Sequence, residues 1–122
     1  CGAEALWIFA AHGWCPLCQS VGKQAETLHD SFAGSGLVSV NVVVQDPDFG
    51  PPDAAYCKKW RDLNGLEDVI TLFDPEGELL PLWSDSTSLS AFVSADRRIV
   101  SKLEHDSNIE HIAAGIEGAL AE

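Results

Sequence analysis

The sequence has no methionine and few basic residues, with seven lysines and arginines against nineteen aspartates and glutamates. Its formal net charge of -12 repels phosphate backbones, so we expect no nucleic acid partner. The sequence also lacks any apolar run that approaches the roughly 18 residues of a membrane-spanning helix. We therefore expect an acidic, water-exposed protein without a transmembrane segment.

Length and composition are ordinary for a globular domain. The 122 residues are 46% apolar and 21% charged. A chain of this length buries roughly two-thirds of the surface that it exposes when unfolded, so it needs neither a disulfide framework nor a structural metal. No stretch is typical of a linker, and we expect one domain over residues 1–122.

The first residues leave two interpretations open. Cys1 followed by Gly2 is compatible with a bacterial lipoprotein after removal of its signal peptide, in which a lipid on Cys1 would tether the protein to a membrane. The alternative is an arbitrary domain start, because the apolar segment that identifies such a signal would lie upstream. The first interpretation predicts an extracytoplasmic location.

Hydrophobic patterning predicts five strands and three helices. The strands are predicted over Leu6–Ala11, Leu37–Val44, Val69–Phe73, Ala91–Ser94 and Ile99–Leu103. The helices are predicted from Pro16 to Gly34, around Tyr56, Trp60 and Leu63 up to Gly65, and from Ile109 to Leu120. Leu79–Trp83 is compatible with a short helix or an edge segment. Alternating strands and helices imply an α/β fold, with a central mixed sheet of four to five strands and helices on both faces.

The motif with potentially reactive side chains is Trp14–Cys18, where an apolar run ends and a helical pattern begins. Two cysteines at this spacing, Cys15 and Cys18, occupy one turn of helix, and Pro16 suits that first turn because its missing N–H costs nothing there. The helix N-terminus favours a thiolate over a thiol, and only the thiolate attacks a disulfide. The motif therefore indicates reversible disulfide chemistry.

These residues resemble a known family. The apolar run into Gly13–Cys18, the valine-rich strand that ends at Asp46, the segment Leu72–Gly77 and the pattern Phe92–Val100 are similar to thioredoxin-fold proteins of the TlpA-like, redoxin type. The resemblance implies a thioredoxin-like fold and a thiol-disulfide oxidoreductase that reduces or exchanges disulfides of client proteins. Such an enzyme is recharged by an upstream thiol donor and works mostly outside the cytoplasm. We expect a monomer without a bound cofactor or metal.

The resemblance also implies roles for the residues of the motif. Cys15 would be the exposed attacking thiolate and Cys18 the resolving thiol, which agrees with the place of Cys18 on the buried stripe of the helix. Trp14 would shield the sulfurs and offer a flat surface to clients. His12 would stabilise the thiolate or relay its proton, unless it is a loop histidine that faces solvent.

The sequence departs from the family pattern at three places. The family's proline before the strand that faces the motif is missing, and its position falls near Ser88 or Leu89, where we expect the substrate groove. The positions that often hold an acid are Phe9 and Val21, so Cys18 lacks an obvious proton acceptor. At residues 96–97 this chain has an Asp-Arg pair where the family has an Asp-Gly turn.

Several other residues have open roles. We expect Cys57 to pack as a half-buried thiol, or else to pair with Cys1 or act as a further resolving thiol. The loop Asp46–Asp53 either borders the motif or is a simple connection. The remaining histidines are expected on helix or loop surfaces and without a function; they are His29, His105 and His111.

Two alternative functions remain. A peroxiredoxin-like thiol peroxidase usually has a threonine or serine three residues before its reactive cysteine and a proline three residues earlier, where this chain has His12 and Phe9. A non-catalytic module that binds a metal or a client is the other alternative, because two thiolates make half of a tetrahedral metal site.

Overall fold

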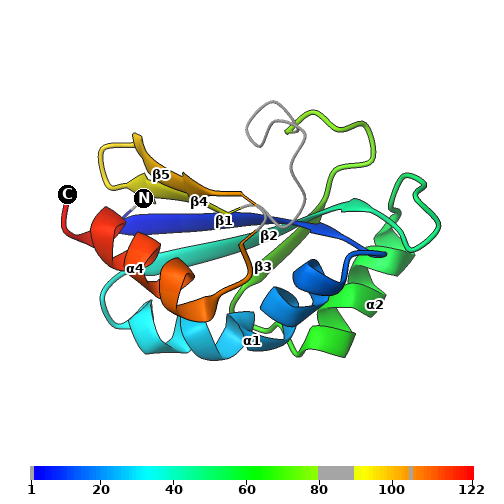
Figure 1. Cartoon of the computed structure of the whole chain (residues 1–122), viewed down its shortest axis with the longest axis horizontal. Helices are drawn as coiled ribbons and strands as arrows, with labels where there is room; N and C mark the ends of the chain where they lie inside the picture. The colour runs from blue at the N-terminus through cyan, green and yellow to red at the C-terminus, as the bar shows by residue number, and fades with distance from the viewer. Residues whose placement is uncertain (1, 80–89, 105) are drawn as a thin grey trace.

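The computed structural model describes residues 2–79, 90–104 and 106–122, and Figure 1 shows the arrangement of strands and helices. The elements are β1 Ala5–His12, α1 Pro16–Ala33, β2 Leu37–Gln45, α2 Ala54–Asn64, β3 Ile70–Phe73, β4 Ser90–Ser94, β5 Ile99–Leu103 and α4 Ile109–Leu120. Each begins and ends close to the boundaries that hydrophobic patterning predicts. None of the helices in this part of the chain is long and apolar enough to cross a membrane.

The strands form one mixed sheet in the order β3-β2-β1-β4-β5. The strands β1, β2 and β3 run parallel, whereas β4 is antiparallel to β1 and β5 is antiparallel to β4. The sheet therefore has the parallel half and the terminal hairpin that the sequence predicts. The predicted α/β class and mixed sheet are confirmed.

The three described helices lie on one face of the sheet (Figure 1). The chain moves from β1 to β2 to β3 in one direction across the sheet, so right-handed crossovers bring α1 and α2 to the same side. The helix α4 joins them, because Ile112 and Ile116 belong to the same buried cluster as Val21 and Trp60. We expected helices on both faces; residues 80–89, between β3 and β4, lie outside the described residues.

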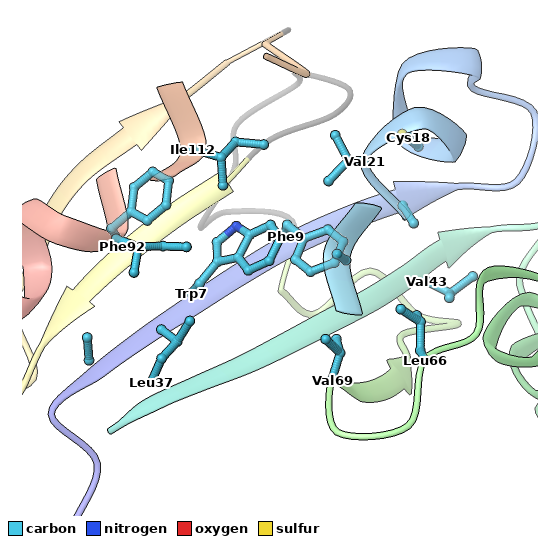
Figure 2. Close-up of a cluster of buried hydrophobic side chains, with 14 of the residues drawn as sticks. Trp7, Phe9, Cys18, Val21, Leu37, Val43, Leu66, Val69, Phe92 and Ile112 are labelled. Atoms are coloured by element: carbon cyan, nitrogen blue, oxygen red, sulfur yellow. The ribbon is translucent and has the colours of Figure 1, made fainter. Parts of the chain in front are cut away.

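The core fills the space between these helices and the sheet (Figure 2). The rings of Trp7 and Phe9 stack with centroids 4.3 Å apart, and the Trp7 Nε1–H donates to Ser90 Oγ at 3.0 Å. The Trp60 Nε1–H donates to Asn41 Oδ1 at 2.7 Å, and the Asn41 side chain donates to the Phe9 carbonyl at 3.1 Å. Asn41 thus joins α2 to two strands and is fully buried with its hydrogen bonds satisfied.

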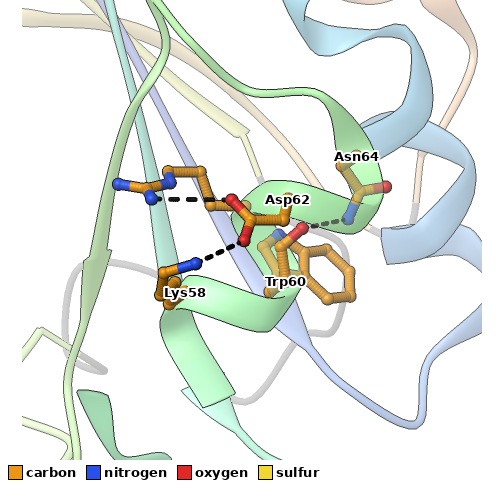
Figure 3. A network of polar contacts seen from close by, with 5 residues as sticks. Lys58, Trp60, Asp62 and Asn64 are labelled. Atoms are coloured by element: carbon orange, nitrogen blue, oxygen red, sulfur yellow. Dashed lines mark hydrogen bonds and ion pairs between the residues drawn. The ribbon is translucent and has the colours of Figure 1, made fainter. Parts of the chain in front are cut away.

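The ends of α2 are fixed by side chains and by a glycine. The Asp53 carboxylate accepts a hydrogen bond from the Tyr56 N–H at 2.7 Å, and Gly65 ends the helix in the left-handed conformation, with φ 64°. The exposed face carries an ion pair between Lys58 and Asp62 at 2.8 Å (Figure 3). This pair is exposed, so it contributes little to stability.

Two histidines differ in environment. His29 is buried, with Nδ1 2.8 Å from Ser39 Oγ, so the expectation of a surface position was wrong. It follows Ala25 by one turn on the face of α1 that packs on β2, and this position buries its ring. His111 is exposed and lies 2.7 Å from Asp106. His105 is outside the described residues.

The β4–β5 turn holds a non-glycine residue in a strained conformation. Arg97 has φ 69°, and its N–H donates to the Ser94 carbonyl at 2.9 Å. The left-handed region is unfavourable for residues with a Cβ atom. Position 97 is also where the sequence departs from the glycine of the resembling family.

We expect Arg97→Gly to raise the free energy of unfolding by up to about 1 kcal/mol, because glycine adopts positive φ without strain while losing more chain entropy on folding. Urea unfolding measures the change. Arg97→Ala is the matched control, since it removes the same side chain and keeps the strain. Equal stability changes in the two variants would show that strain at this position is negligible.

Glu26 connects α1 to the loop before β3. Its Oε1 accepts hydrogen bonds from the N–H groups of Glu67 at 2.9 Å and Val69 at 3.1 Å, and its Oε2 accepts from Asp68 at 2.9 Å. Burial would raise the pKa of Glu26, but these backbone hydrogen bonds, with a smaller contribution from His29, lower it. The carboxylate therefore stabilises the folded protein in its charged form.

We expect Glu26→Gln to lower the free energy of unfolding by about 1–2 kcal/mol at pH 7, because an amide offers one acceptor oxygen to these donors. The pKa of Glu26 is lower in the folded protein, so its contribution is complete above the unfolded value of about 4.3 and is lost as the pH falls through the folded value. The stability difference between wild type and variant should therefore shrink as the pH is lowered below about 4.3. Urea unfolding at several pH values tests this.

The exposed Glu117 on α4 provides the control for this experiment, since Glu117→Gln changes charge equally without these hydrogen bonds. A Glu26→Gln effect that does not decrease as the pH is lowered would contradict the proposed origin of the stabilisation.

Candidate functional site

The cysteine motif lies at the junction of β1 and α1, as predicted. β1 ends at His12, and the Cys15 N–H donates to the His12 carbonyl at 3.0 Å across a tight turn. Cys15 occupies the N-cap position of α1 with extended φ and ψ of -91° and 115°, and Pro16 follows in the first helical turn. The sequence therefore places the first sulfur at the positive end of an eighteen-residue helix.

The two cysteines lie one helical turn apart and are close in space. The Cys18 N–H donates a hydrogen bond to Cys15 Sγ at 3.3 Å, and no disulfide joins the two residues. A backbone N–H aimed at sulfur stabilises negative charge on it. The arrangement can thus support a thiolate at Cys15.

Both cysteines are buried, which differs from the exposed Cys15 that the resemblance implies. Cys15 is 3% exposed and Cys18 is 2% exposed. Cys15 is buried because its side chain turns back over the first helical turn, toward the Cys18 N–H, and packs within the core cluster. Little of the Cys15 surface is therefore accessible in this structure.

Trp14 connects the motif to the loop after β2. Its Nε1–H donates to Gln45 Oε1 at 2.8 Å, and its ring stacks on Phe49 with centroids 4.9 Å apart. The Gln45 amide also donates to the Phe49 carbonyl at 3.3 Å. Of the two interpretations of the loop 46–53, the one in which it borders the motif is therefore confirmed.

His12 is buried rather than facing solvent. The residue is 9% exposed, and its Nδ1 has no hydrogen-bond partner among the described residues. Burial lowers the pKa of the His12 imidazole, so the ring is neutral at pH 7. Its ring centroid lies 5.3 Å from that of Trp14. A role for His12 at the thiols stays a prediction.

The other residues that the sequence analysis considered for the site lie in different environments. Ser88 and Leu89, where we expect the substrate groove, lie outside the described residues. Phe9 and Val21, at positions that often hold an acid in the resembling family, are buried in the apolar core. Cys57 is 8% exposed and forms no disulfide, and burial raises the pKa of its thiol more than Arg61 lowers it.

The structure adds residues that the sequence did not single out. The side chain of Gln45 positions both Trp14 and Phe49, and Asp46 Oδ1 accepts hydrogen bonds from the N–H groups of Asp48 at 2.9 Å and Gly50 at 2.8 Å. The proline and aspartate content of this segment predicts a turn. It does not predict which of its side chains contacts Trp14, because that contact joins separate segments.

Among the described residues, the group of side chains with metal-ligand geometry is acidic and separate from the motif in sequence. Carboxylate oxygens of Glu26, Asp30 and Asp68 lie within 4.8 Å of one another. The Glu26 oxygens already accept backbone hydrogen bonds, as described above. This arrangement is explained by its structural role.

Comparisons with known proteins show which solved structures share this architecture. No family model matches the sequence, and no curated protein matches it. Among solved structures, a secreted Mycobacterium tuberculosis disulfide oxidoreductase homologous to E. coli DsbE is 12% identical, with a TM-score of 0.73, over 93% of this chain and 81% of that one.

Two further structures are similar. StoA from Bacillus subtilis is 16% identical, with a TM-score of 0.73, over 94% of this chain and 84% of its own. A thiol:disulfide interchange protein of the thioredoxin family from Chlorobium tepidum is 14% identical, with a TM-score of 0.76, over 98% and 81%. This chain has a thioredoxin-like fold. Cys15 and Cys18 therefore lie at the start of the first helix of a thioredoxin-like domain.

Gly13 lies in the tight turn before the motif of this thioredoxin-like fold. A Cβ atom on Gly13 would lie 2.8 Å from the Pro47 nitrogen and 2.9 Å from the Asp46 carbonyl carbon, and it would also contact the Tyr56 hydroxyl. Two of these neighbours are backbone atoms, which cannot move aside as a flexible side chain can. The absence of a side chain at position 13 thus permits the loop after β2 to approach the motif.

We expect Gly13→Ala to lower the free energy of unfolding by about 1–3 kcal/mol, because the added methyl group forces the two backbone segments apart. Urea unfolding measures this change. The control is Gly118→Ala on α4, where a Cβ atom meets nothing within 4 Å and alanine favours the helix. Equal stability of the two variants would contradict the close approach at Gly13.

Proposed function

We propose that this protein is a thiol-disulfide oxidoreductase that reduces or exchanges protein disulfides through Cys15 and Cys18. The observation that carries the proposal is the Cys15 sulfur at the N-cap of α1, with the Cys18 N–H donating to it at 3.3 Å. Similar folds in a disulfide oxidoreductase and in a thiol:disulfide interchange protein support the same reaction class.

The proposed reaction has two exchange steps. The Cys15 thiolate attacks one sulfur of a client disulfide, so a mixed disulfide forms and the second client sulfur leaves as a thiolate that takes up a proton. The Cys18 sulfur, after losing its proton, then attacks Cys15, which releases the first client thiol and leaves a Cys15–Cys18 disulfide. Two electrons pass from the dithiol to the client. An external dithiol donor restores the reduced pair.

The second step requires a proton acceptor for Cys18. The positions that hold an acid in the resembling family are apolar here, at Phe9 and Val21. Water that enters with the client, or His12 in its neutral form, can take this proton. Because neither of these two positions offers a carboxylate as the proton acceptor, we expect the resolving step to be slow compared with the first attack.

The proposed partners are client proteins with disulfide bonds and an upstream thiol donor. The similar protein from Mycobacterium tuberculosis is secreted, which supports an extracytoplasmic location for this chain too. A lipid on Cys1, which lies outside the described residues, would add a membrane tether. A mass spectrum of the native protein would detect this lipid, and sedimentation would test the expected monomer.

We expect Cys15→Ser to abolish the acceleration of the reduction of a cystine-containing peptide by dithiothreitol above the uncatalysed rate, because serine cannot attack a disulfide. Cys18→Ser should instead retain the first attack and accumulate a mixed disulfide, since the resolving sulfur is gone. Mass spectrometry identifies this adduct, and the appearance of client thiols measures turnover. The matched control is Cys57→Ser, which should keep at least about half of the wild-type rate.

If the wild type does not accelerate disulfide reduction, the proposed oxidoreductase function is refuted, and the thiol peroxidase and the binding module remain. If Cys15→Ser forms the mixed disulfide and Cys18→Ser does not, the roles of the two cysteines are reversed.

A further inference from the structure

Phe49 combines two unfavourable features in the loop that borders the motif. Its backbone is left-handed, with φ 66°, which is a rare conformation for a bulky residue, and 65% of its surface is exposed. Residues held in such conformations cluster at binding and active sites, where the surrounding structure fixes them. Neither exposure nor backbone strain at Phe49 stabilises the folded protein, so both need another explanation.

Hydrogen bonds fix Phe49 in this position. Asp46 Oδ1 accepts from the N–H groups that flank it, of Asp48 and Gly50, and the Phe49 N–H donates to the Asp46 carbonyl at 3.2 Å. The Gln45 side chain joins the Phe49 carbonyl to the Trp14 indole. The two stacked rings, which we call the aromatic platform, therefore form a rigid surface that adjoins Cys15 in sequence.

A groove of about 380 Å³ lies beside the aromatic platform. Phe49 and Pro51 line it from the loop after β2, Pro75 and Glu76 line it from the segment after β3, and His12 lines it from the end of β1. Glu76 is the one residue with a formal charge at pH 7 among the described residues of this lining. The walls of the groove thus combine apolar side chains with polar groups, and a carboxylate lies at one side.

The acidic residues around the groove indicate which kind of peptide segment it would attract. Asp46 and Asp48 lie in the same loop, and the whole chain has a formal net charge of -12. An acidic surface attracts cationic segments and repels acidic ones. The exposed ring of Phe49 and the prolines that line the groove favour an aromatic or large aliphatic side chain.

We propose that the aromatic platform and this groove bind an extended, cationic client segment that carries an aromatic or large aliphatic residue next to its disulfide cysteine. The proposal rests on the proposed oxidoreductase function and names its substrate class. Phe49 is a specificity residue in this role: it contacts the client chain beside the reacting sulfur and does not take part in the exchange of electrons.

The test compares four disulfide substrates by kcat/KM, with dithiothreitol as donor. Three are cystine peptides that differ only beside the cysteine: one has phenylalanine with lysines, one has alanine with lysines, and one has phenylalanine with glutamates. The fourth is hydroxyethyl disulfide, which has no aromatic, aliphatic or charged side chain for the groove to bind. The wild type should prefer the phenylalanine-lysine peptide about five- to tenfold over each of the other two peptides.

Phe49→Gly removes the ring and also the backbone strain, so it separates recognition from folding. We expect this variant to lose the preference for phenylalanine over alanine, to keep its rate on hydroxyethyl disulfide within about twofold, and to melt at the same or a higher temperature. Phe49→Tyr should restore the preference. The control Ile99→Ala removes a similarly exposed apolar side chain from β5, at the opposite edge of the sheet, and should change none of these rates.

The preference for lysine over glutamate should decrease when sodium chloride rises to about 0.5 M, because salt screens exposed charges. The proposal is overturned if Phe49→Gly keeps the preference for phenylalanine, if it slows all four substrates equally, or if the glutamate peptide is reduced as fast as the lysine peptide. A wild type that reduces none of the four would refute the oxidoreductase function itself.

Discussion

The tight turn between β1 and α1 is the constraint on which the site depends. The Gly13 N–H donates to the Gln45 carbonyl at 2.8 Å, which continues the pairing of β1 and β2 beyond the last residue of β1. The turn then places Cys15 at the N-cap of α1. Because Gly13 has no side chain, the loop after β2 can lie against the same turn. One close backbone approach thus sets both the position of the sulfur and the position of its aromatic neighbours.

The core supports this turn through buried polar side chains as well as apolar packing. Asn41 lies in the middle of β2 and is bonded to Trp60 on α2 and to the Phe9 carbonyl on β1. A buried amide without these partners would be costly, so the network favours one arrangement of α2 over the sheet. That arrangement places the loop between β2 and α2 next to the motif, where its aromatic residue stacks on Trp14.

Sequence periodicity predicted the elements well because their patterns are local. The helix that begins at Pro16 and stops at Gly34 has a continuous apolar stripe, and the turn residues around Gly65 end the next helix. The burial of His29 was missed because a histidine at the margin of the stripe does not reveal whether a partner faces it. In the fold that partner is Ser39 on β2.

The α/β class, the mixed sheet and the pair of cysteines at a strand-to-helix junction could all be predicted from the sequence. The cysteine pair and the single strands and helices follow from spacing within a few neighbouring residues, and the class and the sheet follow from the order of these elements along the chain. The burial of Cys15, the enclosed and neutral state of His12 and the stacking of Phe49 on Trp14 became evident only in the folded protein. Those properties depend on contacts between segments thirty or more residues apart, such as the hydrogen bond from Trp14 to Gln45, with a separation of 31. Such contacts arise from packing, which no local pattern encodes.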